Sequence, residues 1–439
     1  MKILLCTQYF GDCKPVAGTK IAFPLGLSCI ASMISDHELS VFDANLVDDP
    51  LGELRATVEK VDPDVVAISL RNIDGQLSSN VCSYYEPFVS MIKSIKTAAP
   101  TCKLIVGGTG FTVFPEEIMR RNPEIDFGVV SNGEFAIVDL LKNFDHPEKV
   151  KNLVFRRDGE IHFTGTGVPA DLDSLPSPLW EAFDMATYSR FPFSVGIEAK
   201  RGCAFNCVHC LYSCLQGKRV LVRSPKIVVD EIEKLVNDYG ISSFFFVDPI
   251  FNFPFNHGRK ICQEITKRKL NVKWRAWFRS DTMNYSFMVD AVKAGCDIFD
   301  FSPDGASNEA LKVLGKNLSI SDVERSISLV GKIEGARVGY NFMYDLPSAN
   351  LRHLLGLGRL VPKILRTCGR KLQYLCLTRI RIYPHTPIYE IALKDGQITE
   401  QTDLLSPVYY TSKSSKIQHY YASLLGQLIW NQTRKTLGT

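Results

Sequence analysis

Short apolar runs alternate with amphipathic segments along the first third of the chain. Buried strands are predicted at the apolar runs 2–6, 39–43, 64–70, 103–107 and 126–130. Helical spacing of apolar residues lies between these runs, at about 24–35, 50–61, 85–99, 115–121 and 134–143. Such alternation is typical of a parallel sheet with helices on both faces. Residues 1–148 are therefore expected to form a doubly wound, Rossmann-like α/β domain that binds ligands at the carboxyl ends of its strands.

The pattern changes over residues 149–192. Residues 150–165 predict a hairpin that turns at Asp158-Gly159, because these residue types favour turns. Residues 166–192 are rich in proline and show no periodicity, so they are expected to form a linker between domains.

A second series of strands and helices begins at about residue 193. Strands are predicted at 193–199, 243–248, 272–278, 297–302, 336–343 and 373–382. Helices are predicted at 225–239, 255–269, 285–295, 307–315, 320–333, 350–363 and 385–396. Six such units predict a (β/α)6 partial TIM barrel over residues 193–398, with its active groups on loops after the strands. Residues 399–439 are expected to form a small helical cap.

Composition narrows the class of protein. A chain of 439 residues is long enough for two domains, and 51 basic against 47 acidic residues give a net charge of only +4. Without a basic run this excludes a general nucleic-acid binder. No run of 18 apolar residues exists, and the first apolar run is too short for a signal peptide, so a cytoplasmic protein without a membrane span is expected. Most of the 13 cysteines stand singly in apolar runs and are interpreted as buried free thiols, as an anaerobic cell would tolerate.

The segment 200–210 carries the strongest chemical signal. Its thiols Cys203, Cys207 and Cys210 follow a C-x3-C-x2-C spacing. Cysteine thiolates are the usual ligands of iron–sulfur clusters, and three of them leave one position open for a small molecule. A structural zinc site would need a fourth ligand. His209 or Cys214 could supply it, and a zinc loop on Cys207, Cys210 and Cys214 remains an alternative.

The position of this loop suggests a family. It follows the first strand of the second series and has Arg201-Gly202 before the first cysteine. In these features the chain resembles the radical S-adenosylmethionine superfamily. The resemblance implies a [4Fe–4S] cluster on Cys203, Cys207 and Cys210 whose open iron chelates S-adenosylmethionine. His209 stands where the family usually has an aromatic residue.

Later segments extend the resemblance in the same order along the chain. They are the strand that ends at Asp248, the stretches 300–305 and 340–347, and the closing segment 381–389. The resemblance implies S-adenosylmethionine contacts from Phe205, Asp248, Arg279, Ser302, Asp304, Asn341 and Tyr383. Arg279 is expected to pair with the methionine carboxylate. The usual Glu-Ser pair of the family is not intact near Asp304.

The first domain resembles the cobalamin-binding group of this superfamily. The resemblance rests on the segments 23–27, 63–74, 104–111 and 129–134. It implies cobalamin contacts from Ser69, Leu70, Arg71, Gly107, Gly108, Thr109, Gly110, Phe111, Gly133 and Glu134. A flavodoxin-like phosphate site is the alternative for this domain. His37 and His146 are outside any Asp-x-His-x-x-Gly motif, so base-off cobalamin without a histidine ligand is expected, with Ser69, Leu70 and Arg71 at the lower face.

The resemblance implies a radical C-methyltransferase. Methylcobalamin would deliver the methyl group, and a 5′-deoxyadenosyl radical would activate an unactivated carbon of the substrate. The substrate is expected to be a natural product or a peptide or protein side chain, such as a glutamine of methyl-coenzyme M reductase. An electron donor such as flavodoxin or ferredoxin is implied. Two alternatives remain: cyclisation or rearrangement without methyl transfer, and a zinc-stabilised binding protein.

Overall fold

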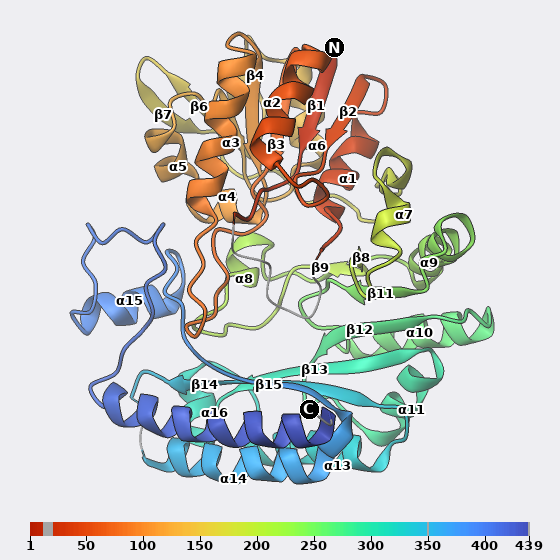
Figure 1. Ribbon diagram of the computed structural model, residues 1–439, viewed down its shortest axis with the longest axis vertical. Coiled ribbons are helices and arrows are strands. Elements are labelled where there is room, and N and C mark those ends of the chain that lie inside the picture. The colour runs from red at the N-terminus through yellow and green to blue at the C-terminus, as the bar shows by residue number, and fades with distance from the viewer. Residues whose placement is uncertain (12–20, 349–350, 438–439) are drawn as a thin grey trace. The chain divides into compact units, whose positions relative to one another are not determined.

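The computed structural model describes residues 1–11, 21–348 and 351–437. These residues form two compact units, each with its own sheet (Figure 1). The first unit contains Met1–Gln76, Asn80–Val195 and Leu405–Pro407. The second contains Leu77–Ser79, Gly196–Leu404 and the chain from Val408 onward.

The sheet of the first unit has seven strands in the order β2-β1-β3-β4-β5-β6-β7. The strands are β1 Lys2–Cys6, β2 Glu38–Phe42, β3 Val65–Ser69, β4 Lys103–Gly107, β5 Phe127–Val129, β6 Leu153–Arg157 and β7 Glu160–Phe163. The first five are parallel, as predicted, and the order reverses at β1. The predicted hairpin is β6 and β7, which continue this sheet as antiparallel strands. The switch point between β1 and β3 is where ligands of doubly wound sheets bind.

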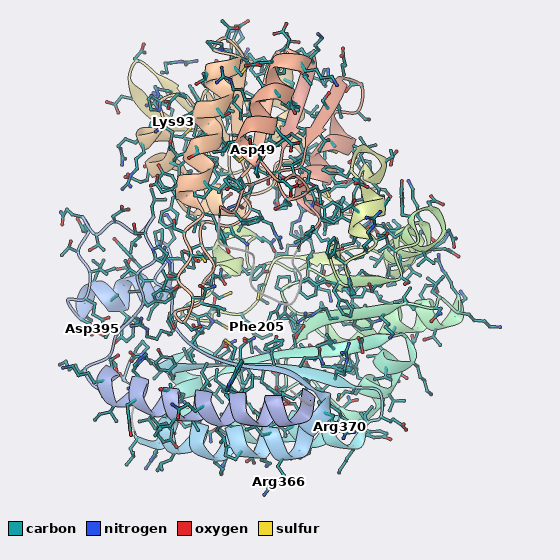
Figure 2. All side chains as sticks on the ribbon, in the orientation of Figure 1. Asp49, Lys93, Phe205, Arg366, Arg370 and Asp395 are labelled. Carbon is teal, nitrogen blue, oxygen red and sulfur yellow. The ribbon has the colours of Figure 1, made fainter. Side chains whose placement is uncertain are left out.

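The helices of the first unit agree with the apolar periodicity. They are α1 Leu25–Met33, α2 Pro50–Val61, α3 Tyr85–Ala98, α4 Thr109–Val113, α5 Pro115–Arg121 and α6 Glu134–Lys142. The start of α2 shows the local cause: the Asp49 side chain accepts from the Gly52 N–H at 3.1 Å, and Pro50 occupies the first turn. Asp49 is labelled in Figure 2.

The segment predicted as a linker packs against the first unit. It contains a short 3-10 helix, η2 Trp180–Ala182, and α7 Met185–Tyr188. Trp180 and Tyr188 are fully buried, and the Phe23 ring lies 5.0 and 5.1 Å from their rings. Three buried aromatic side chains therefore anchor a segment whose sequence has no periodicity.

The sheet of the second unit has six strands in the order β15-β14-β13-β12-β11-β8. The strands are β8 Val195–Ile197, β11 Ser243–Phe246, β12 Lys273–Phe278, β13 Cys296–Asp304, β14 Arg337–Asp345 and β15 Leu372–Arg379. The pairs from β11 to β15 are parallel. Strand order follows chain order, as in a barrel that has not closed, and the predicted α/β fold class is confirmed.

Helices connect these strands where the sequence predicted them. They are α9 Pro225–Tyr239, α10 Phe255–Lys267, α11 Tyr285–Lys293, α12 Asn308–Val313, α13 Ile320–Lys332, α14 Leu351–Cys368 and α15 Pro387–Lys394. The last helix, α16 Ser415–Leu437, lies beside α14 and contacts β14 (Figure 1). Within the described ranges, no helix has the length and apolar character needed to cross a membrane. Several cysteines are buried free thiols, as interpreted: Cys6, Cys102, Cys262, Cys296 and Cys368.

Candidate active site

The cysteine loop follows β8 and is shaped by a small hairpin of β9 Lys200–Arg201 and β10 Leu221–Val222. The Cys203 N–H donates to the Gly217 carbonyl at 3.0 Å, which closes the loop. Gly202 has a φ of +87°, and a Cβ there would overlap the carbonyl oxygen of Arg219. The residue before the first cysteine must therefore be glycine, for backbone conformation and for space.

Burial dominates the electrostatics of Cys203 and Cys210, two of the three predicted ligands. Burial raises the pKa of Cys203, and it raises that of Cys210 to about 12; a charge on Cys207 raises both further. The positive charge of Lys316 acts in the opposite direction on both thiols. In the described residues, no three His, Cys, Asp or Glu side chains converge as they would around one metal ion. A cluster takes each thiolate on a different iron atom, so three thiols on one loop fit it as a donor set.

Cys214 differs from this trio in its surroundings. It lies on α8 Tyr212–Leu215, is exposed, and its Sγ donates to the carbonyl of His385 at 3.2 Å. This contact favours Cys203 over Cys214 as the third ligand.

The predicted residues Phe205 and Arg279 contact each other. Phe205 lies on the cysteine loop (Figure 2), and the Arg279 guanidinium stacks 3.7 Å from the centre of its ring. Arg279 also donates to both carboxylate oxygens of Asp281, at 3.0 and 2.7 Å, and to the Asn317 carbonyl at 2.9 Å. Asp281 and Asn317 thus fix the orientation of the Arg279 guanidinium, which is itself largely buried.

Asp304, at the end of β13, is the centre of a buried ion cluster. Its carboxylate accepts from the Ser302 hydroxyl at 2.9 Å and lies 2.5 Å from Lys316 Nζ and 3.3 Å from His209 Nε2. Burial, the largest single effect, favours the neutral acid, but Lys316 and His209 together outweigh it and lower the pKa of Asp304 to about 2. Asp304 also has a φ of +65°, a conformation that costs energy for a residue with a Cβ. Sequence reasoning singled out Ser302, Asp304 and the position of His209, but missed Lys316.

Asp248, which follows β11, is enclosed by the protein. One carboxylate oxygen accepts from the N–H groups of Ala199 and Lys200 at 2.8 and 3.0 Å. The other lies 3.6 Å from the Lys200 ammonium, which in turn donates to the Phe251 carbonyl. Both charged groups are almost fully buried, and burial raises the pKa of Asp248 to about 6. The carboxylate therefore holds the strand that leads into the cysteine loop. The sequence predicted a ligand contact for Asp248, but its side chain is buried within the protein.

Asn341 and Tyr383, the remaining predicted contacts to S-adenosylmethionine, lie in different surroundings. Asn341 on β14 interacts with Tyr374, whose hydroxyl donates to Asp300 at 2.8 Å. Tyr383 is buried, with Arg381 4.6 Å from the centre of its ring. Asn341 thus belongs to a polar network on the sheet, whereas Tyr383 packs in the closing segment.

The carboxyl edge of β3 and β4 in the first unit carries the predicted cobalamin residues. The Leu70 N–H donates to the Gly107 carbonyl, and the Gly110 N–H donates to the Leu70 carbonyl, both at 2.8 Å. A Cβ on Gly108 would lie 2.6 Å from Leu70 O, and one on Gly110 would lie 2.8 Å from the Asn72 carbonyl carbon. The glycines therefore allow two loops of the protein itself to approach each other, a reason that the sequence analysis did not consider.

Two predicted contact side chains face the core instead. Leu70 and Phe111 are fully buried, and the Phe111 ring packs against Gly128. Glu134 is also buried, whereas Arg71 and Thr109 are exposed. The groups at this edge that a ligand can contact are therefore backbone groups and the exposed polar side chains.

A polar network at the switch point was missed by sequence reasoning. The Gln8 side chain exchanges two hydrogen bonds with the backbone of Asn72, at 2.6 and 3.0 Å. Thr7 donates to Asp43 at 3.0 Å, and the Tyr188 hydroxyl donates to the same carboxylate at 2.5 Å. Single polar residues at strand ends carry no periodic signal, so only their convergence in space reveals them.

The two histidines considered as cobalt ligands lie elsewhere. His37 immediately precedes β2, and His146 follows the end of α6. His37 therefore lies at the amino edge of the parallel strands, whereas ligands bind at the carboxyl edge. Cobalamin without a histidine ligand stays a prediction.

Comparison with known proteins bears on both units. Residues 19–141 match the family described as "B12 binding domain". The structure of the radical S-adenosylmethionine methyltransferase TsrM from Kitasatospora setae superimposes with a TM-score of 0.77 at 19% identity, over 94% of this chain and 82% of that one. The chain has the fold of the cobalamin-binding radical S-adenosylmethionine enzymes. The structural match confirms the fold expected from the resemblance, and the family match confirms a B12 binding domain in the first unit.

Two curated relatives of this chain carry names that refer to different reactions. An uncharacterised methyltransferase of Pyrococcus horikoshii is 24% identical over 98% of this chain and 91% of its own length. The anaerobic magnesium-protoporphyrin IX monomethyl ester cyclase of Cereibacter sphaeroides is 28% identical over 54% of this chain. The match spans 41% of that cyclase, less than half of its length.

The cofactors named for TsrM are those expected here. One structure of TsrM holds cobalamin and a [4Fe–4S] cluster, and another holds tryptophan as substrate and an analogue of S-adenosylmethionine. The predicted cofactor set therefore agrees with the contents of a protein that shares this fold.

Proposed function

We propose that this protein is a cobalamin-dependent radical S-adenosylmethionine methyltransferase that methylates an unactivated carbon. The observation that carries the proposal is the trio Cys203, Cys207 and Cys210 on a loop after the first strand of the second sheet. The match of residues 19–141 to the B12 binding domain supports it from the other unit. When bound, the three cofactors would supply an electron, a carbon-centred radical and a carried methyl group.

The chain's own contribution to the cluster is placement. Cys203, Cys207 and Cys210 would hold it through three thiolates and leave one iron open. Gly202 sets the turn of the loop, and Asp248 fixes the incoming strand through two backbone N–H groups. We assign Asp248 this orienting role in place of direct contact with S-adenosylmethionine, because its carboxylate is enclosed.

Binding of S-adenosylmethionine would use the polar groups after the strands of the second unit. Arg279, oriented by Asp281, is our candidate for the methionine carboxylate, and Phe205 offers an apolar ring beside it. Ser302, two residues before the end of β13, and Asn341, in the middle of β14, are further candidates. An aromatic and apolar surround would exclude water from a radical reaction.

Cobalamin would lie at the carboxyl edge of the first sheet. Arg71 and Thr109 present exposed polar side chains there, and the backbone at Ser69, Gly108 and Gly133 can approach a flat ligand. We propose that none of the histidines in the described residues of the first unit binds the cobalt.

The test is anaerobic reconstitution with iron and sulfide, with hydroxocobalamin added, followed by reduction with dithionite. Cleavage of S-adenosylmethionine to 5′-deoxyadenosine needs no identified substrate, so it can be measured directly. We expect cleavage in the wild type and in Cys214→Ala, and loss of iron and of cleavage in Cys203→Ala. A full cluster in Cys203→Ala, or a protein that binds one zinc and no iron–sulfur cluster, would refute the assignment.

Cyclisation without methyl transfer is the second candidate, favoured by the similarity to the Cereibacter sphaeroides cyclase. Methyl-labelled S-adenosylmethionine separates the two when offered with candidate substrates, namely peptides that contain glutamine and aromatic natural products. Label in the product supports methyl transfer. A product that forms with 5′-deoxyadenosine but carries no label supports cyclisation or rearrangement.

A further inference from the structure

A segment that follows α12 closes around the cysteine loop; we call Leu314–Asn317 the clasp. The Leu314 carbonyl accepts from the Val208 N–H at 3.0 Å. Gly315 has a φ of +67°, and a Cβ there would lie 2.5 Å from the Asn206 carbonyl oxygen. The clasp therefore meets the loop between the first and third cysteines backbone to backbone, at a point that admits only glycine.

A second contact joins the clasp to the loop through Arg279. The Asn317 carbonyl accepts from Arg279 at 2.9 Å, and Arg279 stacks on Phe205 of the loop. The clasp is therefore joined to the loop at both of its ends, by backbone contacts at Leu314 and Gly315 and through Arg279 at Asn317. These contacts fix the position of residue 316, which lies between them.

That side chain is Lys316. Its ammonium lies 2.5 Å from an Asp304 oxygen and donates to the Ser302 carbonyl at 2.8 Å, so two residues of β13 hold it. The side chain is only 12% exposed. The same Asp304 carboxylate lies 3.3 Å from Nε2 of His209, the residue before Cys210, so Asp304 links the ammonium to the cysteine loop. A held, largely dehydrated cation beside three thiolates acts more strongly than a mobile one in water.

We propose that Lys316 is the fixed countercharge of the cysteine loop and raises the reduction potential of the cluster held there. The inference rests on the proposed function, because it requires a [4Fe–4S] cluster on Cys203, Cys207 and Cys210. Adding one electron makes the cluster more negative, and a fixed cation stabilises that state. Asp304 opposes the effect, since its carboxylate partly neutralises Lys316.

A redox titration of the reconstituted full-length protein measures this directly, with dithionite as the reductant and the signal of the reduced cluster in electron paramagnetic resonance as the readout. An opposite charge nearby changes such equilibria by roughly one to three powers of ten. Because Asp304 partly neutralises Lys316, we take the lower end of this range. We expect Lys316→Met to lower the equilibrium constant for reduction of the cluster by about tenfold, which lowers the reduction potential by about 59 mV for one electron. Lys316→Arg keeps the charge and should stay within about threefold of the wild type.

Two further variants make the test specific. Lys312→Met removes an exposed lysine of α12 and should leave the potential unchanged. Asp304→Asn removes the opposing charge and should shift the potential upward, in the opposite direction to Lys316→Met. If Lys316→Met takes up no cluster, the potentials of Asp304→Asn and Lys316→Arg provide the test instead. An unchanged potential in Asp304→Asn would then overturn the proposal.

The outcomes separate this inference from the proposed function. A wild-type protein that binds no iron–sulfur cluster refutes the proposed function, and this inference with it. A wild type with a full cluster, whose potential equals that of Lys316→Met, refutes only the role of Lys316.

Discussion

Replacing Gly202 by alanine tests whether the turn before the first cysteine is shaped by the backbone alone. At a φ of +87° a residue with a Cβ pays about 1–2 kcal/mol for the left-handed conformation. The new methyl group would also overlap the Arg219 carbonyl oxygen, and overpacking against backbone costs roughly 1–3 kcal/mol more. Gly202→Ala should therefore destabilise the loop by about 2–5 kcal/mol.

Gly217 provides a matched control in the same hairpin. It has a similar φ of +82°, but a Cβ there would have nothing within 4 Å. Gly217→Ala should cost only the conformational share, about 1–2 kcal/mol. The difference between the two variants, about 1–3 kcal/mol, isolates the steric contact with Arg219.

Hydrogen exchange of peptides from residues 200–222 measures this difference locally, which matters because a chain with two units has no single unfolding free energy. The Cys203 amide, bonded to Gly217, should exchange about 5–150-fold faster in Gly202→Ala than in Gly217→Ala. Iron uptake should fall in the same order. Equal exchange in both variants would show that the hairpin moves freely, and that the contact does not shape the loop.

Three further predictions concern the scaffold of the second unit. His353 Nδ1 faces the Ala306 N–H, and burial lowers the pKa of His353 to about 4. The unfolded chain takes up a proton below about pH 6.5, so the free energy of unfolding should fall by about 2–3 kcal/mol as the pH drops from 6.5 to 4. Urea titrations of His353→Gln should show a smaller loss over the same pH range. Asp248→Leu leaves the Lys200 charge buried and should cost about 3–5 kcal/mol, whereas adding Lys200→Met should recover part of it; a double variant less stable than the single one in urea would contradict this. Gly356→Ala should lower the melting temperature, because its Cβ would overlap the Ala306 carbonyl; an unchanged melting curve would show that α14 can shift there.

The cofactor contacts implied by the family resemblance divide into two groups in the structure. Arg279, Ser302 and Asp304 lie around the cysteine loop and its clasp, held by named partners. Leu70 and Phe111 of the first unit are core residues. Residue type and motif position predict which strand end a side chain belongs to, but not whether it faces the ligand or the core.

The amino-acid sequence by itself determined the elements and the cysteine loop. Apolar periodicity reflects the burial of one helix face or of a whole strand. The five parallel strands of the first unit and the six strands of the second were therefore predictable. The C-x3-C-x2-C loop after β8 was predictable from its spacing. Only the tertiary structure brought Lys316 to Asp304, enclosed Asp248 with Lys200, and packed Trp180 on Phe23. These contacts join residues that are distant along the chain, and the chain pattern records how each residue is buried but not which partner it meets.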